Sequence, residues 1–185
     1  MKEKAWMFYL DSNDYYVWIL ISAYRDLLKT NTKYPVYCGI TNNINSSTKN
    51  LLNIIGIKTI NLDLSQFVNC RIFKNAQMKQ GPVWAWYNKA FCKLAILESN
   101  VEELFDKIVY LDSDFRILQN IDELMDAPHM SAVANRAPKE PIQPYKHSFS
   151  VFCAGLFVWD FAAADICGAS ISSSIFCRIL KSESR

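Results

Sequence analysis

Short apolar runs alternate with segments of helical periodicity along most of this 185-residue chain. Such alternation is typical of α/β proteins, in which a mostly parallel central sheet is flanked by helices. The length is sufficient for one domain with a hydrophobic core. The sequence contains no internal repeat and no long linker. We therefore expect a single domain over residues 1–185.

The expected elements follow one another in a β-α-β order. One helix, over 15–30, is expected to use Trp18, Ile21, Leu27 and Leu28 for its buried face. Another should end at Gly56, because glycine commonly follows the last residue of a helix. The full prediction is strands at 5–10, 34–40, 58–62, 108–111, 131–134 and 151–159, helices over 15–30, 46–55, 83–98 and 161–181, a helical turn within 117–126 and a loop over 135–150.

Composition disfavours two classes of protein. The net charge is +2 and the basic residues are scattered, so we do not expect nucleic acid as a partner. The apolar run at 17–23 is far shorter than the roughly 20 residues that a transmembrane helix needs. The chain also starts without the pattern of a signal peptide. We therefore expect no transmembrane segment.

The cysteines do not form the patterns of a disulfide framework or a zinc site. No C-x-x-C pair occurs, and His129 and His147 are the only histidines that could join them. Most lie within apolar runs, where reduced cysteine behaves as a small buried hydrophobe. With no signal peptide, this usage predicts a cytoplasmic protein. The six are Cys38, Cys70, Cys92, Cys153, Cys167 and Cys177.

Two carboxylates follow the predicted strand at 108–111, in the sequence Asp112-Ser113-Asp114. Because strand side chains alternate, residues i and i+2 can point to the same side just past the strand's end. Ligand crevices of α/β sheets lie at this carboxyl edge. Two hard oxygen ligands there suit a divalent cation that carries phosphates. The alternative is an acidic surface turn, since short motifs match by chance.

Four segments bring this motif into a wider pattern. They are Ala5 to Tyr16, Trp86 to Lys89 with Phe91 to Leu94, Lys107 to Asp114 with Asn120 to Leu124, and Phe152 to Val158. In this order they resemble the family 8 glycosyltransferases, the glycogenin-like and galactosyltransferase-like group. The resemblance covers about residues 5–161 and leaves 162–185 as a divergent tail. It implies a GT-A (Rossmann-like) nucleotide-diphospho-sugar transferase fold that is incomplete at its C-terminus.

The resemblance also implies an activity, the retaining transfer of a hexose from a UDP-sugar to an acceptor. Mn²⁺ or Mg²⁺ would be held by Asp112 and Asp114 and would neutralise charge on the leaving diphosphate. The acceptor, whether glycan, protein or lipid, is not specified by these residues. A homodimer stays an open alternative.

The donor residues implied by the resemblance come from all four segments. Tyr16 would stack on the uridine, Ser12 and Asn13 would hydrogen-bond it, and Ser113 would lie near the ribose. Tyr16 read alone could equally be a helix-face aromatic residue, and Lys89 a solvated lysine. The full set is Leu10, Ser12, Asn13, Tyr16, Lys89, Asp112, Ser113, Asp114, Cys153, Ala154 and Gly155.

Two departures from the family pattern bear on catalysis. Cys153 stands where the family commonly has asparagine, and a thiol is a poor substitute in hydrogen bonding. The family's Asp-Gln-x-x-Leu/Phe segment and its His-x-x-Gly-x-x-Lys-Pro-Trp segment do not occur in these residues. The sequence therefore assigns no catalytic residue. Our hypothesis is a donor-binding half with weak or no turnover by itself.

Two alternatives differ in class. One is a nucleotide-sugar-binding or interaction module with the same fold and no turnover. The other is a phosphatase of the haloacid dehalogenase type, which also places Asp-x-Asp after an apolar strand. In that type a Thr or Val usually follows two residues after the second Asp, whereas this chain has Arg116 there. The motif also lies in mid-chain, so the sequence disfavours the phosphatase.

Overall fold

The computed structural model describes residues 2–64, 92–97, 99–128 and 156–160. Within these ranges five strands form one sheet in the order β3-β2-β1-β4-β5. The first four strands run parallel, and β5 is antiparallel to β4. The mostly parallel α/β sheet predicted from the sequence is confirmed. The strands are β1 (Glu3–Leu10), β2 (Val36–Ile40), β3 (Lys58–Asn61), β4 (Phe105–Leu111) and β5 (Leu156–Asp160).

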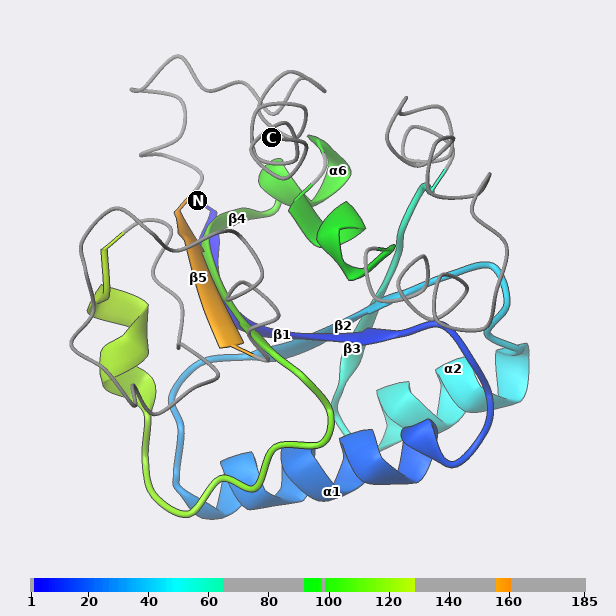
Figure 1. The fold of residues 1–185 in the computed structure, drawn as a ribbon, viewed down its shortest axis with the longest axis horizontal. Coiled ribbons are helices and arrows are strands. Elements are labelled where there is room, and N and C mark those ends of the chain that lie inside the picture. The colour runs from blue at the N-terminus through cyan, green and yellow to red at the C-terminus, as the bar shows by residue number, and fades with distance from the viewer. Residues whose placement is uncertain (1, 65–91, 98, 129–155, 161–185) are drawn as a thin grey trace, which may run out of the picture.

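Helices lie on both faces of the sheet. Figure 1 shows α1 and α2 on one face and α6 on the other. The second helix starts at an N-cap, since the side chain of Asn45 accepts a hydrogen bond of 2.8 Å from the backbone of Thr48. It ends before Gly56, whose φ of 100° confirms the predicted helix stop. The helices are α1 (Tyr16–Lys29), α2 (Ser46–Ile54), the 3₁₀ turn η1 (Lys93–Leu97), α6 (Ser99–Glu102) and the 3₁₀ turn η2 (Asp122–Asp126).

Strand alternation divides the core into two clusters, one on each face. Trp6 and Phe8 of β1 are fully buried in the cluster that includes α1 and α2. Met7, between them in sequence, is fully buried in the opposite cluster with Ile96 of η1. Burial of each such side chain contributes about 1.5–3 kcal/mol relative to an exposed one. Central strand β1 is therefore held from both faces.

The predicted inner face of α1 was wrong at two positions. Trp18 is 67% exposed and Leu28 is 47% exposed, although both were expected to be buried. The helix begins at Tyr16, whose backbone N–H donates to the carboxylate of Asp14 at 3.0 Å. From that start, the inward stripe with spacings of three and four is Val17, Leu20, Ala23, Tyr24 and Leu27.

Other expected elements are only partly described. The predicted helix over 83–98 is seen from Cys92 to Leu97, mostly as η1, and its earlier part lies outside the described residues. The strand at 131–134, the loop at 135–150 and the helix at 161–181 lie outside them too. The helical turn predicted within 117–126 is confirmed as η2. No described helix has both the length and the apolar character needed to cross a bilayer.

The strand order contains a reversal beside β1. After β1 the chain winds to β2 and β3 on one side, and β4 then lies on the other side of β1. In open α/β sheets a reversal of this kind leaves a crevice outside the carboxyl ends of the two strands. Here these ends are Leu10 of β1 and Leu111 of β4. The fold therefore places a crevice beside Asp112-Ser113-Asp114.

Candidate functional site

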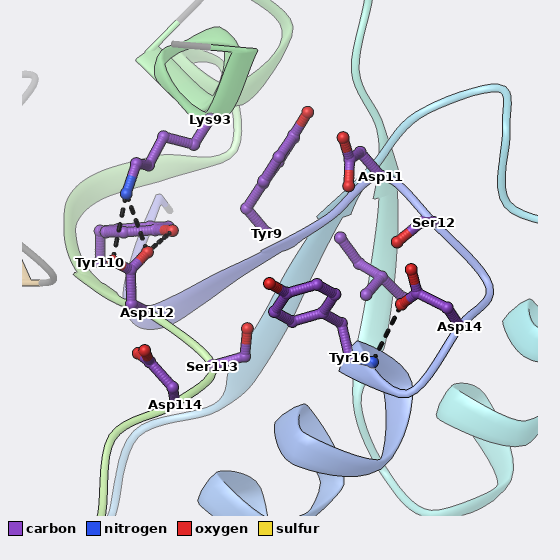
Figure 2. Close-up of a pocket in the computed structure, with 11 residues that line it drawn as sticks. Tyr9, Asp11, Ser12, Asp14, Tyr16, Lys93, Tyr110, Asp112, Ser113 and Asp114 are labelled. Carbon is purple, nitrogen blue, oxygen red and sulfur yellow. Dashed lines mark hydrogen bonds and ion pairs between the residues drawn. The ribbon is translucent and has the colours of Figure 1, made fainter. Parts of the chain in front are cut away.

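A pocket of about 310 Å³ lies at this crevice (Figure 2). Its volume is within the range of roughly 300–1,000 Å³ that small-molecule sites occupy. The described lining comes from three segments: the end of β1 with the following loop and the first residue of α1, the end of β4 with the acidic motif, and η1. The lining residues are Tyr9, Leu10, Asp11, Ser12, Asp14, Tyr16, Lys93, Tyr110, Asp112, Ser113 and Asp114.

The lining carries an excess of negative charge. Four carboxylates, those of Asp11, Asp14, Asp112 and Asp114, face one ammonium, that of Lys93. A concave surface lined by one sign of charge concentrates counter-ions. An anionic ligand such as a diphosphate would be repelled unless a cation entered with it. The electrostatics of the pocket therefore favour a cation, or an anion that is accompanied by one.

The carboxylate of Asp112 is held by two neighbours. The Lys93 ammonium lies 2.9 Å and 3.1 Å from its two oxygens. The Tyr110 hydroxyl, two residues earlier, donates to the nearer oxygen. Burial, together with the adjacent negative charge of Asp112, raises the pKa of Tyr110 well above its usual value, so the phenol stays protonated and remains a donor. Figure 2 shows Lys93 reaching from η1 to Asp112.

Asp114 lies on the same loop as Asp112 and lines the same pocket. The turn between them is closed by the backbone N–H of Phe115, which donates to the carbonyl of Asp112 at 3.3 Å. Two carboxylates within a negatively charged pocket are the hard oxygen donors that Mn²⁺ or Mg²⁺ takes. This donor set fits a divalent cation. Within the described ranges, no group of three or more His, Cys, Asp or Glu side chains is placed to hold a metal.

Of the three predicted donor residues between β1 and the start of α1, two line the pocket and the third, Asn13, does not. Ser12 and Tyr16 line the pocket, and residue Tyr16 is 41% exposed. Asn13 lies outside the lining: its amide donates to the carbonyl of Asn43 at 2.6 Å and accepts from the backbone of Asn45 at 3.0 Å. Asn13 thus ties the loop after β1 to the loop after β2.

Hydrogen bonds hold the segment after the acidic motif against α1 and the residues that follow it. Arg116 donates to the carboxylate of Asp26 at 2.6 Å, and the amide of Asn120 donates to the carbonyl of Thr30 at 3.0 Å. Further on, the carboxylate of Asp122 accepts from the backbone N–H of Lys33 at 3.1 Å. These three contacts join α1 and the residues that follow it to the chain that runs from β4 into η2. They fix the direction in which the chain leaves Asp114.

Most of the donor residues predicted from sequence lie in this pocket. Leu10, Ser12, Tyr16, Ser113 and the two aspartates of the motif are in its lining. Lys89, Cys153, Ala154 and Gly155 lie outside the described residues.

Sequence reasoning missed five residues of the lining, which are Tyr9, Asp11, Asp14, Lys93 and Tyr110. Lys93 is the most consequential of them, and it falls within the Phe91–Leu94 segment that carried the family resemblance. The strand period could have found Tyr9 and Tyr110. Tyr9 lies two residues after Met7, on the same face, near the carboxyl end of β1, and Tyr110 lies two residues before Asp112.

Tyr9 brings a phenol close to η1. Burial is the main cause that raises the pKa of Tyr9 above its usual value, with Cys92 and Asp11 adding to the effect. The phenol is therefore neutral at physiological pH and adds no charge to the pocket. It contributes a polar, uncharged wall between the loop after β1 and η1.

Comparison with known proteins gives a consistent relationship. No protein-family model matches the chain. Galactinol synthase 1 from Ajuga reptans is 29% identical over 126 residues, which are 68% of this chain and 34% of that protein. The uncharacterized protein C4C3.09 of Schizosaccharomyces pombe is 25% identical over 134 residues, 72% of this chain and 32% of that protein.

Solved structures show the same fold. The galactosyltransferase LgtC in complex with donor and acceptor sugar analogues superposes with a TM-score of 0.51 at 14% identity, over 85% of this chain and 58% of that chain. An active-site mutant of LgtC gives a TM-score of 0.51 at 15% identity, over 85% and 57% of the two chains. This chain is thus similar in sequence to galactinol synthase 1 and similar in fold to LgtC. The GT-A fold predicted from the sequence is confirmed for the part that is described. The chain spans about a third of the length of the curated relatives it matches.

The contact between Asp26 and Arg116 predicts a pH dependence of stability. The hydrogen bond from Arg116 lowers the pKa of Asp26 below 3.8, with the charges of Arg116 and Lys29 adding to the effect against the opposing influence of burial. A carboxyl group whose pKa is lower in the folded state than in the unfolded state stabilises the fold at pH values above its unfolded-state pKa. This stabilisation is lost as the pH falls through the folded-state pKa. The free energy of unfolding should therefore decrease as pH falls below 3.8.

Asp26→Asn should remove this contribution. Urea unfolding should show the largest deficit relative to the wild type at neutral pH, and a smaller deficit at pH values below 3.8. Asp106→Asn, at an exposed position of β4, is the matched control and should leave the profile unchanged. A deficit of equal size across the whole pH range would contradict this role of Asp26.

Proposed function

We propose that this protein binds a nucleoside diphosphate sugar, with UDP as the nucleotide, and takes part in glycosyl transfer from that donor. The observation that carries the proposal is the meeting of Asp112-Ser113-Asp114 with the loop after β1 in one pocket at the β1/β4 reversal. This is the position where α/β sheets bind nucleotides. Similarity to galactinol synthase 1, and the fold shared with the galactosyltransferase LgtC, support the class of reaction.

The two ends of the ligand would contact different walls of the pocket. The accessible ring of Tyr16 offers a stacking face for a base, and Leu10 adds an apolar surface beside it. Ser12 offers a hydroxyl to the nucleoside from the loop after β1, and Ser113 offers one to the ribose from the acidic motif. The diphosphate would lie toward Asp112, Asp114 and Lys93.

Asp112 and Asp114 would hold a divalent cation, Mn²⁺ or Mg²⁺. Such an ion supplies positive charge against the diphosphate that leaves when the bond from sugar to phosphate breaks. The pocket's own residues give the reason an ion is needed: four carboxylates alone would repel the diphosphate. Lys93 would add a second positive charge from η1.

The chemical step we propose is transfer of a hexosyl group with retention of anomeric configuration. The bond from the anomeric carbon to the diphosphate oxygen breaks, and a bond from that carbon to an acceptor hydroxyl forms. The acceptor's proton leaves with the diphosphate or passes to solvent. We assign no catalytic residue to this step.

A donor-binding module without turnover is the second candidate. It is favoured by one observation, that the described part of the pocket supplies two carboxylate ligands and no third metal ligand. Fewer protein ligands leave more coordination sites to water and weaken the hold on the cation. Release of hexose from UDP-galactose or UDP-glucose, measured beside UDP binding, separates the two. Binding with no release above a chelated blank favours the module, and release that needs Mn²⁺ favours the transferase.

Removing either carboxylate of the motif should weaken cation-dependent binding of the nucleotide. We expect Asp112→Asn and Asp114→Asn each to weaken UDP binding in Mn²⁺ by at least about tenfold, roughly 1.4 kcal/mol, because each loses a charged ligand to the ion. Isothermal titration calorimetry with UDP, with and without Mn²⁺, measures this. Asp106→Asn makes the same change of charge at an exposed position of β4 and should bind like the wild type. Unchanged Mn²⁺-dependent binding in both motif variants would contradict the proposal.

The stacking role of Tyr16 predicts a loss that depends on the base. Tyr16→Ala should weaken UDP binding by about 1–3 kcal/mol, the usual contribution of a base stacked on an aromatic ring. Binding of pyrophosphate, which has no base, should stay the same. Trp18→Ala, at a position 67% exposed on the same helix, is the control and should leave UDP affinity unchanged. If Tyr16→Ala weakened the binding of UDP and of pyrophosphate equally, the ring would support the loop and would not contact the base.

A further inference from the structure

Lys93 is the only lysine or arginine among the described residues that line the pocket. Its side chain is 20% exposed, and its ammonium also lies 5.3 Å from the centre of the Tyr110 ring. The ammonium is engaged with both oxygens of Asp112, at 2.9 Å and 3.1 Å. One of the two carboxylates available to a divalent cation therefore already has a cationic partner.

The oxygens of Asp112 have little capacity left. A carboxylate offers about four lone-pair sites. Here three are used, two by Lys93 and one by the hydroxyl of Tyr110. A divalent cation at these oxygens would meet an ammonium at hydrogen-bond distance from them, and two cations this close repel each other strongly in a partly buried site. The ion and Lys93 cannot both keep full contact with Asp112.

We propose that Lys93 competes with the divalent cation for Asp112, and that its displacement from Asp112 couples binding of the cation to binding of the diphosphate. This inference rests on the proposed function, because it takes Asp112 as a ligand of the ion. An ammonium that gives up Asp112 to the ion stays on η1, in the wall of the same pocket. Its new partner is the anionic ligand, whose phosphate oxygens accept charge-assisted hydrogen bonds.

Competition of this kind has a reciprocal consequence. Without nucleotide, the ion must displace Lys93 and leave the ammonium without its carboxylate, so the ion binds weakly. With a diphosphate present, the ammonium regains an anionic partner, so the ion binds more tightly. By thermodynamic linkage, the ion strengthens nucleotide binding by the same factor. Lys93 would thus bias the pocket toward taking up ion and nucleotide together.

Lys93→Met tests the competition, because methionine keeps much of the apolar stem and removes the charge. The test is a titration of the full chain with Mn²⁺, with and without UDP, in which electron paramagnetic resonance reports the concentration of free Mn²⁺. Without UDP, the variant should bind Mn²⁺ about three- to tenfold more tightly than the wild type, the size of a partly exposed ion pair. The factor by which UDP enhances Mn²⁺ binding should fall by a similar amount. Lys49→Met, which removes an equal charge at a lysine bonded to Asn61 outside the pocket lining, should change neither quantity.

The outcomes separate this inference from the proposed function. In one outcome the wild type binds Mn²⁺, Asp112→Asn does not, and Lys93→Met binds it equally or more weakly than the wild type. This result overturns the competition and is consistent with the proposed donor site. Mn²⁺ binding by the Lys93→Met variant but not by the wild type supports the competition, since Lys93 of the wild type then excludes the ion. Absence of Mn²⁺ binding in both proteins, with or without UDP, overturns both proposals.

Chemical labelling of the wild type gives a second test that needs no variant. The rate at which acetic anhydride modifies Lys93, followed by mass spectrometry and normalised to Lys49, reports how firmly the ammonium is held. Mn²⁺ alone should raise this rate at least about twofold, since an ammonium that has lost an ion pair is more reactive. Addition of UDP should lower it again. A rate that stays constant while Mn²⁺ saturates the protein would overturn the proposal.

Discussion

The parallel pairing of β1 with β4 is the constraint on which the rest of the site depends. It places Met7 opposite Tyr110, so that the two strands end close together and Asp112 follows at the level of Tyr9. Both strands are buried by clusters on the two faces of the sheet, which fixes their register. Because the strand order reverses at this pair, a crevice lies beyond their ends, and the loops that follow them line a pocket.

The pocket's charges oppose one another in a way that suits an exchange of ligands. Four carboxylates would repel a phosphate group, whereas a divalent ion held by two of them would present a positive charge to it. The ammonium of Lys93 pairs with one of the four carboxylates, that of Asp112, and contacts both of its oxygens. The contacts of Arg116, Asn120 and Asp122 with α1 and the segment after it hold the acidic loop against the domain. In the exchange that we propose, Lys93 and Asp112 would thus change partners beside a loop whose position these contacts fix.

The alternation of strands and helices was sufficient to predict the mostly parallel sheet. Strand periodicity was sufficient to predict the shared location of Asp112 and Asp114, because a two-residue repeat at the end of a buried strand leaves few alternatives. It could not choose Lys93, since the residue that reaches Asp112 depends on how η1 crosses the sheet, and this is set by long-range packing of residues such as Ile96. The predicted buried face of α1 was wrong at Trp18 for a related reason: Val17 and Trp18 are both apolar, and which of them faces the core is set by how the helix packs against the sheet. Asn13 was predicted to contact a ligand, and its bonds to the next loop follow from tertiary proximity that no local pattern encodes.

The central claim is that the ion and the nucleotide share the pocket between the ends of β1 and β4. Paramagnetic broadening of backbone amide signals by substoichiometric Mn²⁺, in the presence of UDP, tests it most directly. The account predicts that Ser12, Ser113 and Asp114 broaden first, while Leu104 and Phe105, at the amino end of β4, keep their intensity. Broadening centred elsewhere, or none at nucleotide saturation, would contradict it.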